Sequence, residues 1–148
     1  MKEPLLISAC LLGTPCRYDG KSVPLPEKQL AALRESFELV PICPESDGGL
    51  PTPRIPSERL GERVINRAGE DVTDAYRRGA AHALETARRE GCAFALLKER
   101  SPSCGCGEIY DGSFSGTLIP GDGVTAELLK AEGIEVIGES AFFEKEHD

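Results

Sequence analysis

Short apolar segments that alternate with amphipathic ones constrain the fold of this chain more than any other feature. Four of them have the length and continuous apolar character of strands buried on both faces of a parallel sheet: residues 4–10, 37–43, 93–98 and 134–137. Between them, apolar residues recur at helical spacing in three stretches: residues 27–35, 73–89 and 125–131. Strands alternating with helices predict an α/β fold, a three-layer domain with a mainly parallel, Rossmann-like sheet. The length of 148 residues is typical of one domain.

The remaining segments predict a small hairpin, the start of the long helix, a glycine-rich loop and a charged tail. Residues 63–66 and 71–72 flank an Ala-Gly turn, which is typical of a small hairpin. We expect Thr73 to cap the long helix that follows it. The glycine-rich stretch 109–123 predicts a loop with room for one short strand, and the charged tail at 142–148 is expected to fray.

Composition and charge exclude several classes of function. The chain has 17 Lys and Arg against 25 Asp and Glu, a net charge of −8, and it lacks a basic block that could follow a phosphate backbone. Aromatic residues make up only 5% of the chain, so we expect no extended nucleic-acid binding. No apolar run approaches the roughly 18 residues of a membrane span, and the N-terminus lacks the pattern of a secretory signal. We therefore expect a cytoplasmic protein without a membrane partner; the sequence specifies no oligomeric state.

Cysteine usage is the most informative feature for function. The chain has six cysteines, Cys10, Cys16, Cys43, Cys92, Cys104 and Cys106, and in a reducing compartment such residues serve metal binding or catalysis more often than disulfides. Cys92 lies where a helix gives way to a strand, and we interpret it as a buried thiol. The first strand ends at Cys10, the second ends at Cys43, and the third leads into the loop that holds Cys104. Because the carboxyl ends of parallel strands meet at one edge of a sheet, we expect these three thiols to lie together.

Three or four convergent thiolates bind a soft metal centre, either zinc or an iron–sulfur cluster. The cysteine spacings contain no C-x2-C pair, so the motif of a zinc ribbon is absent. Neither histidine completes a zinc site, since His82 falls in the middle of the long helix and His147 in the tail. Spacing alone leaves zinc and a cluster equally open. It also leaves open a non-catalytic metal-binding module and a thiol redox protein that uses Cys104 and Cys106.

Polar residues beside these thiols suggest proton chemistry. Glu45 is two residues after Cys43 and is the acidic residue nearest in sequence to any of the three thiols. A carboxylate beside a metal centre with an open coordination position is a candidate proton carrier. Ser101, three residues before Cys104, and Arg17, directly after Cys16, are further polar residues beside cysteines and are candidates for a catalytic role. For each of these side chains alone, the satisfaction of loop backbone groups explains its presence at least as well.

Seven short motifs occur in order along the chain: SACLLG at 8–13, CRYDG at 16–20, CPE at 43–45, GL-x-x-PR at 49–54, G-x-DVT at 69–73, K-x-x-SPSCG at 98–105 and IYDG at 109–112. Together they resemble the thiouracil desulfidase family over about residues 5–139. The resemblance implies a [4Fe-4S] cluster held by only three cysteines, at positions that correspond to Cys10, Cys43 and Cys104. It also implies that Cys16 is not an essential ligand and that Cys106 falls at a variable position.

The same resemblance implies a reaction. The iron that no cysteine holds binds the sulfur of thiouracil, water replaces that sulfur, and uracil and hydrosulfide form without net electron transfer. The acid–base residues of the family correspond to Glu45 and Ser101. The expected protein is thus a single desulfidase domain, residues 1–148, that acts on a thiolated pyrimidine base or nucleoside.

Overall fold

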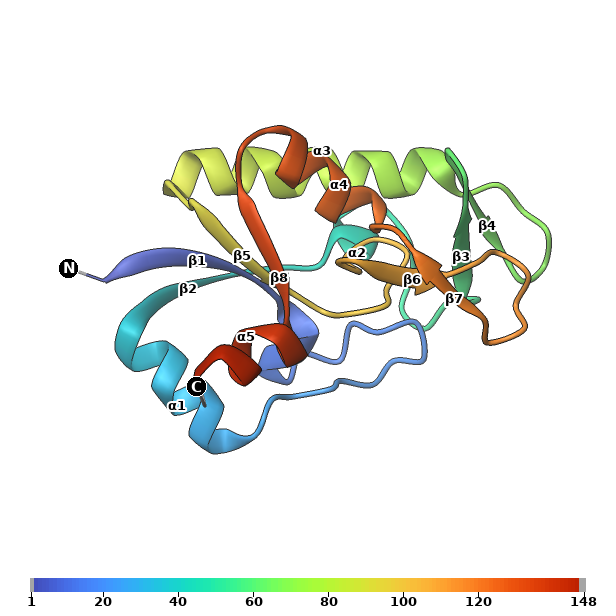
Figure 1. The fold of residues 1–148 in the computed structure, drawn as a ribbon. Coiled ribbons are helices and arrows are strands. Elements are labelled where there is room, and N and C mark those ends of the chain that lie inside the picture. The colour runs from blue at the N-terminus through green and yellow to red at the C-terminus, as the bar shows by residue number, and fades with distance from the viewer. Residues whose placement is uncertain (1, 147–148) are drawn as a thin grey trace.

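The computed structural model describes residues 2–146, and its helices and strands form three layers (Figure 1). The central sheet has four parallel strands in the order β2-β1-β5-β8: β1 Glu3–Ser8, β2 Phe37–Ile42, β5 Phe94–Leu97 and β8 Glu135–Gly138. Two helices cover each face, α3 (Thr73–Glu90) and α4 (Val124–Ala131) on one, α1 (Glu27–Ser36) and α5 (Glu139–Glu146) on the other. The predicted three-layer α/β architecture is confirmed, with a strand in each of the four apolar segments.

The central strands are buried on both faces, as their composition predicts. In β1, the side chain of Leu6 packs with the α3 and α4 layer, whereas Leu5 and Ile7 pack with the α1 and α5 layer. β5 alternates in the same way, with Leu97 on the first face and Leu96 on the second. Each of these side chains is at most 1% exposed, so each contributes roughly 1.5–3 kcal/mol of transfer free energy to folding.

The strand order creates a switch point between β1 and β5. The chain leaves β1 toward β2 on one side and later enters β5 on the other side of β1. The connections that follow these two neighbouring strands therefore diverge. Open α/β sheets bind their ligands in the crevice at such a point, beyond the carboxyl ends of the strands.

The long helix α3 carries the predicted apolar stripe, whose members are all buried: Ala75, Tyr76, Gly79, Ala80, Ala83, Leu84 and Ala87. The start of the helix differs from the expectation, because Thr73 is its first residue and does not cap it. The Thr73 hydroxyl donates to Asp71 Oδ1 (2.5 Å) and accepts from the Val64 N–H (2.9 Å). Asp71 Oδ1 also accepts the Thr73 N–H at 2.9 Å, so Asp71 satisfies a first-turn donor in place of the predicted cap.

Two hairpins outside the main sheet correct the sequence expectations. β4 (Arg63–Asn66) pairs with β3 (Ser57–Leu60), and the predicted partner, residues 71–72, contributes one isolated bridge. β6 (Glu108–Tyr110) and β7 (Leu118–Pro120) form a second hairpin where one short strand was expected. Both hairpins lie at the same end of the molecule, beyond the carboxyl edge of the sheet (Figure 1).

Helix α5 occupies most of the tail that was expected to fray. Phe143 is 7% exposed and packs into the layer that contains α1, and its ring lies 5.0 Å from that of Phe142 in an edge contact. Burial of the Phe143 ring anchors a helix whose other residues are largely charged. His147 lies outside the described residues. Within residues 2–146, no helix is both long and apolar enough to cross a membrane.

Candidate active site

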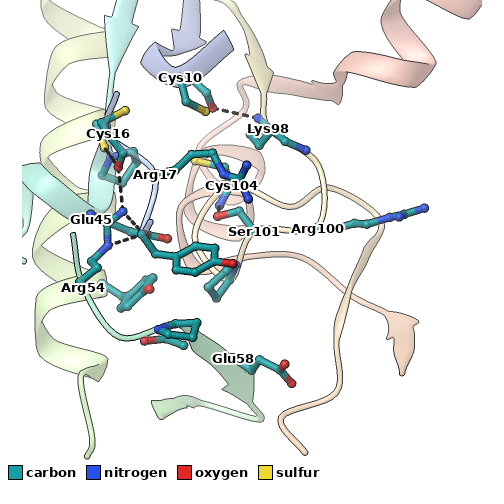
Figure 2. Close-up of a pocket in the computed structure, with 18 of the residues that line it drawn as sticks. Cys10, Cys16, Arg17, Glu45, Arg54, Glu58, Lys98, Arg100, Ser101 and Cys104 are labelled. Atoms are coloured by element: carbon teal, nitrogen blue, oxygen red, sulfur yellow. Dashed lines mark hydrogen bonds and ion pairs between the residues drawn. The ribbon is translucent and has the colours of Figure 1, made fainter. Parts of the chain in front are cut away.

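A cavity of about 730 Å³ lies at the carboxyl edge of the sheet, at the switch point between β1 and β5 (Figure 2). The ends of β1, β2 and β5 and the connections that follow them form its inner wall. The outer wall comes from β3, β6 and the loop between β6 and β7. Its volume falls in the range typical of small-molecule sites.

The cavity brings together four of the six cysteines: Cys10, Cys16, Cys43 and Cys104. Cys10 lies in η1 (Ala9–Leu12), the turn directly after β1, and Cys43 directly precedes α2 (Pro44–Asp47). Cys104 lies in the loop after β5. Cys10 and Cys104 are buried and Cys43 is half-buried. The expected convergence of three strand ends on one edge therefore occurs in the structure.

Burial and mutual contacts raise the pKa of three of these thiols, Cys16, Cys43 and Cys104. Burial raises the pKa of Cys104 to about 12, against the opposing effect of the Ser8 hydroxyl. The pKa of Cys43 is raised first by the Cys16 side chain and then by burial, and the Cys10 side chain raises the pKa of Cys16. In the metal-free protein, Cys43 and Cys104 are therefore neutral near pH 7. Metal coordination at either sulfur releases its proton.

Two glycines fix α2 and the residues beside it. A Cβ atom at Gly79 of α3 would lie 1.8 Å from the carbonyl oxygen of Pro44, and a Cβ at Gly48 would lie 2.0 Å from a carbonyl oxygen of α3. The backbones of α2 and α3 are therefore in direct contact, which a larger side chain at either position prevents. Because Pro44 stands between Cys43 and Glu45, this contact holds both of these residues at the cavity wall.

Ser101 holds the turn that carries Cys104. Its Oγ accepts hydrogen bonds from the backbone N–H groups of Ser103 (3.1 Å) and Cys104 (3.0 Å). Gly123 packs against the same turn, where a Cβ atom would lie 2.4 Å from the carbonyl carbon of Ser103. The Ser101 hydroxyl thus satisfies loop backbone groups, one of the two roles considered for it. Its own hydrogen is not used in these bonds, and Ser101 lines the cavity.

Glu45 lies at the cavity wall in an ion pair with Arg54 (Figure 2). Arg54 Nε donates to Glu45 Oε2 at 2.9 Å, and Arg54 Nη2 contacts the same oxygen. The Arg54 and Glu45 side chains are only 6% and 14% exposed. Tyr76 of α3 also lines the cavity. Burial and then the charge of Glu45 raise the pKa of its hydroxyl. Arg54 was not predicted to be a site residue, although its place in the GL-x-x-PR motif was a sequence feature that pointed to it.

The structure keeps the other cysteines and the described histidine away from the cavity lining. Cys92 packs in the core with α3 and α4, which confirms its interpretation as a buried thiol. The Cys106 thiol donates to the carbonyl oxygen of Val136 at 3.4 Å. His82 is exposed on α3, where its Nδ1 lies 3.3 Å from a carboxylate oxygen of Asp47.

The donor set of the cavity is soft. Thiols from separate elements line it, with the Glu45 carboxylate and the Ser101 hydroxyl beside them, and Arg17 also contributes to its wall. In the part of the chain that the structure describes, no three Cys, His, Asp or Glu side chains are arranged around a single metal ion. A cluster does not need that arrangement, because each cysteine sulfur binds a different iron. The donor set is therefore compatible with an iron–sulfur cluster.

Known proteins are similar to this chain in sequence and in fold. Residues 5–141 match the 2-thiouracil desulfurase family. The uncharacterized protein YbbK of Bacillus subtilis (strain 168) is 42% identical over 146 residues, which cover 92% of this chain and 95% of that protein. Among solved structures, the [4Fe-4S]-dependent thiouracil desulfidase TudS is 49% identical, with a TM-score of 0.92 over 97% of this chain and 95% of that chain. The likeness extends over nearly the full length of each chain.

Proposed function

The chain belongs to the 2-thiouracil desulfurase family, and on this basis we propose that it is a [4Fe-4S]-dependent thiouracil desulfidase. The enzyme replaces the sulfur of thiouracil with the oxygen of water and produces uracil and hydrosulfide. One observation carries the proposal: a cavity at the carboxyl edge of the sheet is lined by thiols, a carboxylate and a hydroxyl. The similarity to TudS, which is described as a [4Fe-4S]-dependent thiouracil desulfidase, supports the cofactor and the reaction.

Cys10, Cys43 and Cys104 are the proposed cluster ligands. They come from three separate elements, and each follows a strand of the rigid sheet. Cys16 shares the cavity but is proposed to be non-essential. When bound, the cluster supplies an iron that no cysteine holds, a soft Lewis acid suited to the sulfur of a thiocarbonyl group.

Glu45 is the proposed carrier of protons. Arg54 anchors its carboxylate through Oε2, so Oε1 is available to take a proton from the attacking water. The same carboxyl group then gives that proton to the ring or to the departing sulfur, and its charge is restored. Ser101 donates a hydrogen bond to the substrate or the water while its oxygen holds the turn. Because oxygen replaces sulfur at an unchanged oxidation state, the reaction needs no electron donor or acceptor.

The proposed substrate is a small thiolated pyrimidine, either the base or its nucleoside, and the proposed location is the cytoplasm. The cavity volume of about 730 Å³ accommodates a ligand of this size. The net charge of −8 disfavours binding of a long polyanion. The whole chain, residues 1–148, is proposed to act as a single desulfidase domain.

Two other functions receive less support. A thiol redox protein built on Cys104 and Cys106 needs both sulfurs at one site, whereas the Cys106 thiol donates to the Val136 carbonyl and is not part of the cavity wall. A non-catalytic metal-binding module does not require the Glu45 carboxylate to be buried at the cavity wall in an ion pair with Arg54. Such pairs cost desolvation energy and are weak contributors to stability.

Anaerobic reconstitution tests the proposal. The purified protein is loaded with iron and sulfide, its iron and acid-labile sulfide are measured, and thiouracil is then added. We expect about four irons and about four sulfides per chain, followed by repeated release of uracil and hydrosulfide. Protein loaded with zinc is the matched control and should release neither product. A protein that holds a full cluster and produces no uracil would contradict the proposed reaction.

A further inference from the structure

We infer that Arg54 is a positioning residue that fixes the direction in which the Glu45 carboxylate faces the substrate, an inference that rests on the proposed function. Arg54 belongs to the segment between α2 and β3, nine residues after Glu45. Both side chains line the cavity, and Figure 2 shows the guanidinium beside the carboxylate.

Every N–H donor of the Arg54 guanidinium has a protein partner. The group has five N–H bonds, and five hydrogen bonds account for them. Nε and Nη2 bind Glu45 Oε2, Nη1 binds the Pro51 carbonyl (3.2 Å) and Thr52 Oγ1 (3.0 Å), and Nη2 also binds the Cys16 carbonyl (3.0 Å). With no donor left over, Arg54 is not free to bind a substrate group. Its influence on the reaction passes through Glu45.

Both contacts with Glu45 end on one oxygen. Because Nε and Nη2 share Oε2, the plane of the carboxylate is set from one side and Oε1 has no arginine contact. This contact holds the Oε2 side of the carboxylate against Arg54 and limits the positions that Oε1 takes. Such placement matters for proton transfer, since a displacement of about 1 Å costs roughly 10²-fold in rate.

The same guanidinium joins three chain segments at the cavity: the loop after η1, helix α2, and residues 51–52. The backbone N–H of Arg54 adds a bond of 2.6 Å to the Tyr18 carbonyl. Lysine concentrates its three donors on one nitrogen and cannot reproduce a planar bridge of this kind. The variant Arg54→Lys therefore keeps the charge and removes the geometry.

Kinetics of single and double variants test this role. In cluster-loaded protein, Arg54→Lys is expected to lower kcat by about 10²-fold, with KM for thiouracil within about 2-fold and iron content retained. In a Glu45→Gln background, the same change is expected to lower kcat by less than about 3-fold, because the group through which Arg54 acts no longer carries a proton.

Arg59→Lys is the matched control. The Arg59 side chain is 12% exposed and paired with Glu127, so it is buried to a similar degree, but it does not line the cavity. Arg59→Lys also keeps the charge and removes the planar guanidinium. It is expected to change kcat by less than about 2-fold, because the positions of the reacting groups are not affected.

Unfolding of the metal-free protein gives a readout that depends on neither cluster nor reaction. Arg54→Lys and Glu45→Gln are each expected to lower Tm, and the double variant is expected to lower it by less than the sum, because one ion pair is lost in all three. Arg54→Gln is measured in the same cycle and replaces the lysine variant if that protein does not fold. Additive losses of kcat in an active enzyme would overturn the role of Arg54 alone. A cluster-loaded wild-type protein that releases no uracil would overturn the proposed function, and the role with it.

Discussion

The two ends of β5 carry cysteines that are equally buried but lie in different surroundings. Cys92, two residues before the strand, and Cys104, in the loop after it, are each 6% exposed. Cys92 packs among apolar side chains. Cys104 also touches that core, but it lines the cavity, where Ser8 and Glu45 act on its pKa. Burial therefore does not separate a packing thiol from a candidate ligand, whereas the edge of the sheet does.

The difference between the edges comes from the lengths of the connections. Residues 91–93 join α3 to β5 at the amino edge, a turn too short to enclose a ligand. Residues 98–107 leave β5 at the carboxyl edge and include the turn that Ser101 holds. The long connections after β1 and β2 reach the same edge, so side chains from three places in the sequence surround one cavity.

The largest expected effect follows directly from this comparison. Cys104→Ser should abolish cluster loading, because a hydroxyl is a poor ligand for iron in a cluster and only two of the three proposed ligands, Cys10 and Cys43, remain. Cys92→Ser should load a normal amount of iron and lower the stability of the metal-free protein by about 1–3 kcal/mol, the cost of a poorly partnered buried hydroxyl. Iron and acid-labile sulfide analysis of both proteins, with urea unfolding of the metal-free forms, makes the test. Loss of iron from the Cys92 variant alone would reverse the assignment.

Glu45→Gln sharpens the comparison within the cavity by separating proton transfer from cluster binding. The amide keeps the size of the side chain and removes its titratable group. Uracil release should fall by roughly 10²–10⁴-fold, the usual worth of a general acid–base residue. The absorbance of the cluster should remain, since Glu45 is not a proposed ligand. An undiminished rate with a full cluster would leave the cluster and bulk water as the whole catalyst.

Ser101 is expected to have a smaller effect, because water can replace a single hydroxyl in the reaction. Ser101→Ala removes the acceptor for two backbone N–H groups, so we expect about 1–2 kcal/mol lower stability of the metal-free protein. Uracil release per bound cluster should fall by roughly 10-fold, the equivalent of one hydrogen bond. Ser101→Thr retains the oxygen and serves as the control. If release per cluster is unchanged in the alanine variant, Ser101 only holds the turn.

The smallest effects are expected at the two remaining thiols. Cys106→Ser should retain most of the cluster, because Cys106 does not line the cavity. Cys16→Ser should also retain most of it, although Cys16 interacts with the proposed ligands Cys10 and Cys43. Equal iron content in the two variants would support a three-cysteine ligand set. Loss of the cluster on Cys16→Ser, with retention in a Cys104→Ser protein, would replace Cys104 by Cys16 in that set.

Local sequence patterns predicted the sheet, α3 and the convergence of the thiols. Continuous apolar runs and a helical stripe depend on neighbouring residues, and the meeting of strand ends follows from parallel topology. The pairing of β3 with β4 was missed because Ser57–Leu60 is largely polar and lacks β-branched residues, so only tertiary contacts select it. The helix at the C-terminal end was missed because charged residues follow Phe143 in the sequence, whereas the burial of Phe143 stabilises the helix.

The ion pair between Glu45 and Arg54 could not be predicted from local patterns. A loop rich in glycine and proline separates the two residues, and their contact depends on how that loop folds back over α2. The role of Ser101 as a turn acceptor was one of two open alternatives, because a serine near a cysteine serves either backbone or substrate. Contacts between segments, rather than composition, decide both cases.

Mössbauer spectra of protein loaded with iron-57, recorded before and after anaerobic addition of thiouracil, test the central claim most directly. If Cys10, Cys43 and Cys104 each hold one iron, the fourth iron alone is open to substrate. About one quarter of the iron signal should then change when thiouracil is added, while about three quarters stay as they were. A spectrum in which no iron responds, from protein that still converts thiouracil to uracil, would contradict the claim that substrate sulfur meets an open iron.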